Sequence, residues 1–244
     1  MSTLTHLLQP VAEPSIYEMP AAQPESPSLA EARSRSSSHF GLEQIGLLAR
    51  QLFFPGCAKP PRHVVFSAVD ESTYVAEICM DVARALAAQV SGRVCVIEAN
   101  PHNPELETIF GRENEEATSS RDGFGFLRSS SRQMTGNLWL APRRLLTGST
   151  EDGMSTAWLE RRLADFRLEF EYTLLHAPAV GKHCEAVLLG RLSDGVALVL
   201  EANSTRRAAA LRAKEKLQSA NTRLLGTVLS ERTFPIPEGI YRRL

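Results

Sequence analysis

Short apolar runs alternate with helical repeats of apolar residues from residue 63 to residue 229. Several of these runs, rich in Val, Ile and Leu, lack a clean apolar–polar alternation, which is typical of strands buried on both faces. They predict strands at 63–69, 93–98, 137–141, 171–176, 195–201 and 223–229. The repeats between them predict helices at about 74–90, 103–110, 155–168, 182–192 and 204–219. This alternation predicts an α/β fold, with a mostly parallel central sheet and helices on both faces.

The rest of the chain divides into three kinds of segment. Residues 1–39 are rich in Pro and Ser and predict a disordered tail. Residues 40–61 predict an amphipathic helix followed by a linker, because apolar residues recur at helical spacing up to Pro55. Residues 62–244 form the predicted α/β domain, in which the polar stretch 112–133 is expected to be an extended surface loop.

Composition and charge narrow the class of protein. The chain has 244 residues, is 43% hydrophobic and 23% charged, and carries a formal net charge of -1. These values are those of an ordinary globular protein and give no electrostatic basis for binding nucleic acid. The 4 cysteines have no C-x-x-C spacing, which favours free thiols in a reducing compartment. With no long apolar run and no signal-peptide pattern, we expect a cytoplasmic protein.

The turn after the first strand stands where a nucleotide-binding protein would carry a phosphate loop. Such a loop needs glycines to curl its backbone around phosphate, a lysine to reach the terminal phosphates, and a Ser or Thr to hold magnesium. The sequence from Asp70 to Ala76 is D-E-S-T-Y-V-A and has no glycine or lysine. The simplest interpretation is an ordinary strand-to-helix turn with Ser72 or Thr73 as the helix N-cap.

Two further motifs resemble one family. The segment 93–106, R-V-C-V-I-E-A-N-P-H-N-P-E-L, is similar to the acidic motif V-L-L-I-D-A-D/N-x-R-x-P-x-L of the bacterial tyrosine kinases that control capsule and exopolysaccharide synthesis. The segment 170–180, F-E-Y-T-L-L-H-A-P-A-V, resembles that family's magnesium strand F-D-Y-V-I-I-D-x-P-P-V. The order and spacing of the motifs match over about 62–244. The resemblance implies the P-loop fold of the deviant Walker ATPases, which include MinD and ParA.

The resemblance also indicates which positions have lost their chemistry. In the phosphate loop, Ser72 and Tyr74 stand where the family has glycines, Val75 replaces the phosphate lysine, and Ala76 replaces the magnesium hydroxyl. Tyr74 would oppose the close backbone approach of a glycine, and Val75 removes the cation that faces the β and γ phosphates.

The two acidic motifs differ in what they keep. Glu98 preserves a carboxylate on a longer stem, whereas His176 replaces the aspartate that would sit behind the metal. Losing the lysine, the hydroxyl and the aspartate together removes most of the charge compensation that phosphoryl transfer requires. We therefore expect no catalytic residue, no bound cofactor and no metal.

These substitutions lead to a functional hypothesis. The chain is expected to be a pseudo-ATPase or pseudokinase that acts as a scaffold or regulator in capsular or exopolysaccharide synthesis and export. The resemblance implies a membrane-bound polysaccharide chain-length or export protein, or an active kinase paralogue, as partner. Such a partner would give peripheral association with the inner membrane.

Two rival hypotheses stay open. In a divergent active tyrosine kinase, Glu98 would hold magnesium, Arg121 would substitute for the lysine, and ATP with magnesium would be the cofactor. A weaker alternative is a ParA-like or MinD-like positioning protein. Self-association is also open, because Gly46 and Ala49 follow Glu43 where the family's E-x-x-R-x-x-R oligomerisation helix has arginines.

A zinc site was the remaining candidate chemistry. His176, His183 and Cys184 lie close in sequence, but no fourth ligand stands at a recognised spacing. The three residues also fall on a strand end and a helix start. We therefore predict no zinc site from this group.

Overall fold

The protein is described from a computed structural model, which places residues 41, 43–71, 75–109, 125–147 and 155–230 well enough to be described. The predicted tail at 1–39 lies outside these residues. So do Ser72, Thr73 and Tyr74 of the phosphate-loop positions, and Arg121. The domain boundaries proposed above stay predictions.

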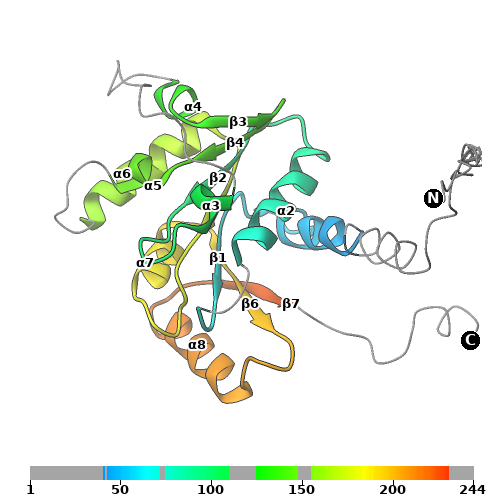
Figure 1. Ribbon diagram of the computed structural model, residues 1–244, viewed down its shortest axis with the longest axis vertical. Coiled ribbons are helices and arrows are strands. Elements are labelled where there is room, and N and C mark those ends of the chain that lie inside the picture. The colour runs from blue at the N-terminus through cyan, green and yellow to red at the C-terminus, as the bar shows by residue number, and fades with distance from the viewer. Residues whose placement is uncertain (1–40, 42, 72–74, 110–124, 148–154, 231–244) are drawn as a thin grey trace, which may run out of the picture. The chain divides into compact units, whose positions relative to one another are not determined.

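A seven-stranded sheet with the order β3-β4-β2-β5-β1-β6-β7 forms the centre of the unit that spans 40–244 (Figure 1). Its strands are β1 (His63–Ala68), β2 (Val94–Glu98), β3 (Arg132–Thr135), β4 (Leu138–Ala141), β5 (Tyr172–His176), β6 (Gly195–Glu201) and β7 (Leu224–Ser230). The β3–β4 pair is antiparallel and every other pair is parallel. The predicted mostly parallel α/β sheet is therefore confirmed.

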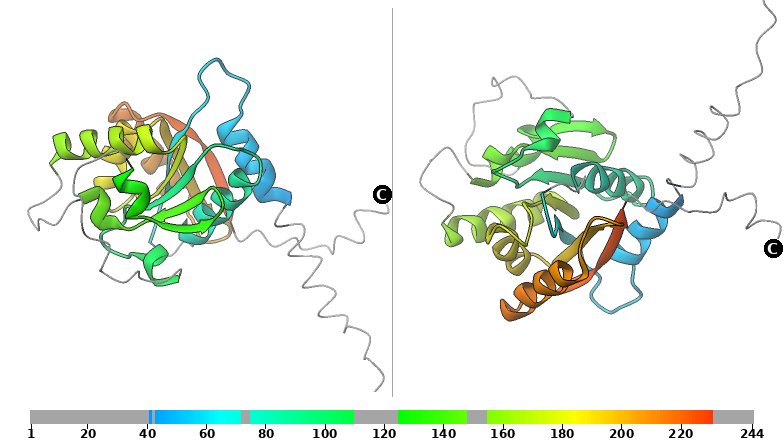
Figure 2. Two further views of the ribbon diagram at one scale, coloured as in Figure 1. Left: turned by 90° about the horizontal axis from the view of Figure 1, so that it is seen from above. Right: turned by 60° about the horizontal axis from the view of Figure 1, so that its bottom comes forward.

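Helices cover both faces of this sheet (Figures 1 and 2). They are α2 (Val75–Ala87), α3 (Glu105–Ile109), α4 (Phe126–Ser129), α5 (Arg143–Thr147), α6 (Thr156–Glu169), α7 (Glu185–Leu192) and α8 (Arg207–Ser219). Residues 43–53, ahead of β1, are also helical. None of the described helices is both long and apolar enough to cross a membrane.

Alternate residues of each central strand belong to two separate apolar cores. Val64 and Phe66 of β1 pack with α2 and the helical residues 43–53, whereas Val65 belongs to the core beneath α4 to α8. Because both faces are covered, the strands read as continuous apolar runs in the sequence. Every predicted strand lies within one residue of its observed bounds, including the partly buried β7.

The helix at 43–53 packs on its own domain. Ala49 and Phe53 are completely buried, and the Phe53 ring meets the Tyr172 ring of β5 edge-on, with centroids 5.8 Å apart. Ala49, at a position where the resemblance would place an arginine, is therefore a core residue.

The prediction of an extended loop at 112–133 is wrong for its described part. Residues 126–129 form α4, and β3 begins at Arg132. The carboxylate of Glu169, at the end of α6, accepts hydrogen bonds from the backbone N–H groups of Gly125, Leu127 and Arg128. These bonds satisfy the first N–H groups of α4, and the partner lies about forty residues away, so no local pattern indicates the helix. Helix α5 was likewise not predicted.

The side chain of His63, in β1, has an unusual protonation equilibrium. Burial lowers its pKa from 6.5 to about 4, and the positive charges of Arg167 and Arg62 act in the same direction against the opposing charge of Asp194. Its Nδ1 lies 2.8 Å from Thr173 Oγ1 on β5. The folded protein therefore keeps this imidazole neutral at pH values where the unfolded chain binds a proton.

We predict that His63 makes the protein less stable as the pH falls from about 6.5 to about 4. The unfolded chain takes up the proton first, so the free energy of unfolding falls through this window, by up to about 3 kcal/mol, and is unaffected by His63 at higher pH. Urea unfolding at pH values of about 7.5, 6, 5 and 4 measures this loss of stability. His63→Asn should flatten the decline, and an unchanged slope in this variant would contradict the assignment.

Candidate functional site

A cavity of about 160 Å³ lies at the carboxyl ends of the three central strands, β1, β2 and β5. Parallel strands in a doubly wound sheet form their ligand crevices at this edge. Residues that follow each of the three strands line the cavity, including Glu71 after β1, Asn100 after β2 and Pro178 after β5. The predicted phosphate loop, acidic motif and magnesium strand thus meet at one place.

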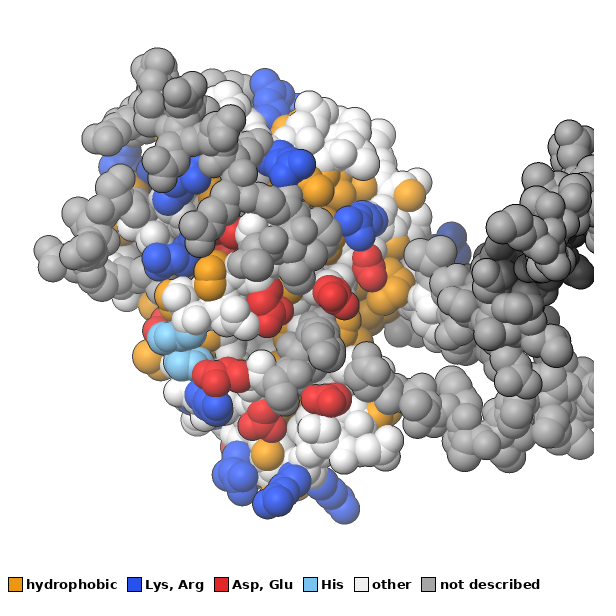
Figure 3. All heavy atoms as spheres, viewed as in Figure 1, with side chains coloured by type: hydrophobic (Ala, Val, Ile, Leu, Met, Phe, Trp, Pro, Cys, Tyr) orange, Lys and Arg blue, Asp and Glu red, His pale blue; other side chains and the backbone are white. Residues whose placement is uncertain are grey.

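The cavity wall is rich in carboxylates and imidazoles. The face shown in Figure 3 carries Asp and Glu side chains close to histidine side chains. The titratable residues that line the cavity are Asp70, Glu71, Glu105, His102, His176 and His183. Within the described part of the chain, no lysine or arginine lines it. Such a lining favours a cation over a polyphosphate anion.

The described phosphate-loop positions belong to the apolar core. Val75 and Ala76 form the first turn of α2, and both are buried among the residues of the core on that face of the sheet. Val75 also lines the cavity. The positions that would supply a cation and a hydroxyl therefore present only methyl groups.

Glu98 and His176, at the ends of β2 and β5, contact each other directly. The two residues are register partners in the sheet, and His176 Nδ1 lies 2.9 Å from Glu98 Oε1. The side chain of His176 is 3% exposed and that of Glu98 is 0% exposed. An ionised carboxylate can only accept, so a hydrogen bond between these two atoms requires the imidazole proton on Nδ1.

The Glu98 carboxylate has two further donors. Its Oε1 accepts the backbone N–H of Asn100 at 2.9 Å, and its Oε2 accepts that of Leu106 at 3.0 Å. Together with His176, these donors compensate for burying the charge and fix the loop between β2 and α3. The carboxylate that the resemblance would assign to magnesium is thus committed to the protein itself.

Glu71, on the turn after β1, is bound by two neighbours from the loop after β5. Lys182 Nζ lies 2.6 Å from its Oε2, and His183 Nε2 lies 2.8 Å from its Oε1. The hydrogen bonds from Lys182 and His183 lower the pKa of Glu71 to about 2. In contrast, burial raises the pKa of Glu105. Lys182, which lies near the cavity, is therefore paired with a carboxylate.

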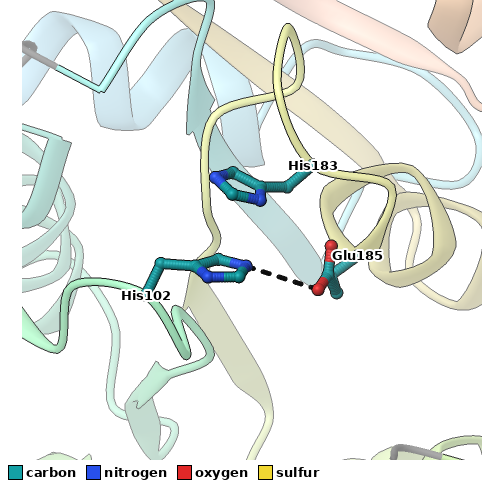
Figure 4. Close-up of side chains that lie close together, drawn as sticks. All are labelled: His102, His183 and Glu185. Atoms are coloured by element: carbon teal, nitrogen blue, oxygen red, sulfur yellow. Dashed lines mark ion pairs between the residues drawn. The ribbon is translucent and has the colours of Figure 1, made fainter.

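A second group of side chains at the cavity, formed by His102, His183 and Glu185, was missed by sequence reasoning. His102 and His183 stack with ring centroids 3.7 Å apart, and His102 Nε2 lies 3.4 Å from Glu185 Oε1 (Figure 4). The zinc hypothesis had combined His183 with His176 and Cys184. Instead His176 turns to Glu98, and His183 meets His102. The available signal was that both histidines follow strands whose carboxyl ends share one sheet edge.

Both the sequence and the fold of this chain resemble those of known proteins. The chain is 23% identical over 149 residues to the tyrosine-protein kinase YwqD of Bacillus subtilis (strain 168), covering 59% of this chain and 61% of that protein's length. Among solved structures, the VpsO kinase domain matches with a TM-score of 0.64 and 16% identity, covering 84% of this chain and 100% of that one. No protein-family model matches.

The MinC:MinD cell division complex of Aquifex aeolicus matches with a TM-score of 0.56 and 17% identity, over 75% of this chain and 72% of that one. The chain resembles the bacterial tyrosine kinases and has the MinD-like fold. The resemblance expected from the sequence motifs is therefore confirmed. The match to YwqD spans just under two thirds of that kinase.

We predict that the Glu98 carboxylate is a major contributor to stability. Glu98→Ala leaves the N–H groups of Asn100 and Leu106 and the His176 ring without their acceptor, so it should lower the free energy of unfolding by about 3–5 kcal/mol. Glu98→Gln keeps the shape and one acceptor oxygen and should cost about 1–3 kcal/mol. Urea unfolding measures both. Equal stability of Glu98→Ala and the wild type would contradict this role.

Proposed function

We propose that this protein is a pseudo-ATPase of the exopolysaccharide tyrosine kinase type, which acts by binding partners rather than by turning over ATP. Its role would be that of a scaffold or regulator of capsular or exopolysaccharide synthesis. The resemblance of its motifs to the kinases of these pathways supports the pathway. The chemistry of the cavity supports the loss of catalysis.

The proposal is supported above all by the burial and hydrogen bonding of the Glu98 carboxylate. A magnesium ion needs carboxylate or hydroxyl oxygens that it can reach. Glu98 is completely buried and accepts hydrogen bonds from His176, Asn100 and Leu106. To bind magnesium it would have to release the imidazole, which is itself the substituted metal position.

The electrostatics of the cavity point the same way. ATP brings several negative charges, which active sites of this kind balance with lysine, arginine and magnesium. Here Asp70, Glu71 and Glu105 line the cavity, and Lys182 is bound to Glu71. The divergent-kinase alternative would need a cation that the described lining does not supply.

The partner follows from the resemblance. Kinases of this type work with membrane-bound chain-length or export proteins, so we propose such a protein, or an active kinase paralogue, as the partner. Association with the membrane would then be peripheral and indirect. A ParA-like positioning role is less favoured, because it would depend on an ATP-driven dimer.

We predict no measurable binding of ATP with magnesium at protein concentrations in the micromolar range. Isothermal titration of the purified protein checks binding, and release of phosphate and tyrosine autophosphorylation check turnover. An active bacterial tyrosine kinase domain under the same conditions serves as the positive control. Micromolar affinity, or hydrolysis that Glu98→Gln abolishes while the variant stays folded, would overturn the proposal.

A further inference from the structure

The group formed by His102, His183 and Glu185 has the composition of a transition-metal site. Each residue offers one ligand atom, and these three atoms all lie within 4.8 Å of one another. Imidazole nitrogens with a carboxylate oxygen suit zinc and similar divalent ions, whereas magnesium prefers oxygen ligands alone. We infer that His102, His183 and Glu185 bind a divalent transition-metal ion, with zinc as the best fit.

The three ligands come from two segments that the fold holds in place, the loop after β2 and the turn from β5 into α7. His102 lies on the loop after β2, where its N–H donates to Asn100 Oδ1 at 3.1 Å. His183 lies on the loop after β5, where Lys216 Nζ donates to its carbonyl oxygen at 3.2 Å. Glu185 is the first residue of α7. The backbone positions are therefore fixed before any metal arrives.

Each ring leaves one nitrogen for a metal, but the in-plane lone pairs of the stacked rings run nearly parallel, so one ring has to turn out of the stack to bind. His183 Nε2 is occupied by Glu71 Oε1 at 2.8 Å, which leaves Nδ1 as the nitrogen available to a metal. His102 presents Nε2 to the Glu185 carboxylate, and Figure 4 shows the two stacked rings beside that carboxylate. Glu71, His183 and the metal would then form the carboxylate–histidine–metal arrangement that commonly orients an imidazole ligand.

The distances require movement of side chains, including one imidazole that turns out of the stack. Tetrahedral zinc, with bonds of about 2.0–2.1 Å, separates its ligand atoms by about 3.3 Å. The contact between His102 Nε2 and Glu185 Oε1 is already 3.4 Å. Rotation of partly exposed side chains closes the remaining spread, and solvent reaches the site because the His102 side chain is 43% exposed. Water fills the fourth position.

A bound metal would link the loop after β2 to the turn from β5 into α7, at the cavity. The folded state would bind the ion and the unfolded chain would not hold these ligands together, so binding would raise the melting temperature. The His102 and His183 side chains also line the cavity, but their binding of a metal does not require that the cavity bind a nucleotide.

The experiment uses the full chain, purified without a histidine tag and stripped of metal with EDTA. Titration with zinc chloride should give one ion per chain with micromolar or tighter affinity, and a higher melting temperature. Cobalt chloride should give the visible absorption of a tetrahedral site. Magnesium chloride should give none of these effects.

Variants locate the site. His102→Ala and His183→Ala should each weaken zinc binding at least about tenfold, and Glu71→Gln, which removes the support of His183, by about 10-fold to 100-fold. Cys57→Ser, which removes an exposed thiol away from the site, is the matched control and should bind zinc like the wild type. Without metal, the variants should have the same melting temperature as the wild type, which separates lost binding from lost folding.

Three results would overturn the inference. Absence of zinc binding to the wild type, or affinity that is unchanged in both histidine variants, excludes this site. Binding that disappears only in Cys57→Ser also excludes it, because the metal would then be held by the Cys57 thiol.

Discussion

The buried carboxylate of Glu98 is the interaction on which the functional edge of this fold depends. A charge at 0% exposure is tolerable only if nearby donors replace its water. Those donors come from three places: the imidazole of His176 on β5, the N–H of Asn100 in the following loop, and the N–H of Leu106 in α3. The strand pair, the loop and the helix must therefore all be in place together, and the geometry of the cavity follows from that requirement.

This arrangement gives the substitutions a common physical meaning. His176 lies within hydrogen-bond distance of Glu98, so the carboxylate is satisfied within the protein. Val75 and Ala76 then extend the apolar core to the cavity wall instead of presenting polar atoms to it. The cavity lining is accordingly dominated by carboxylates and imidazoles. The backbone frame rests on the buried apolar residues of the strands.

Much of the fold was predictable because its information is local. A strand buried on both faces needs apolar residues at consecutive positions, and β6 was predicted at its observed bounds for that reason. Helix α4 was not predictable, because its first N–H groups are satisfied by Glu169 from a distant helix. The side chain of Asn137 likewise donates to the carbonyls of Ala87, Val90 and Gly92, which lie far from it in sequence. Such contacts leave no periodic signal.

The candidate site likewise has residues that the sequence could predict and residues that it could not. Motif spacing identified Glu98 and His176, but only the β2–β5 pairing makes them partners. His102 and Glu185 were missed because their proximity depends on the order of strands in the sheet, which the sequence does not state. Glu71 is the residue that links both halves of the site: it pairs with Lys182 and also holds His183. By neutralising the nearby lysine while orienting an imidazole, this one carboxylate makes the rim unfavourable for an anion and favourable for a cation.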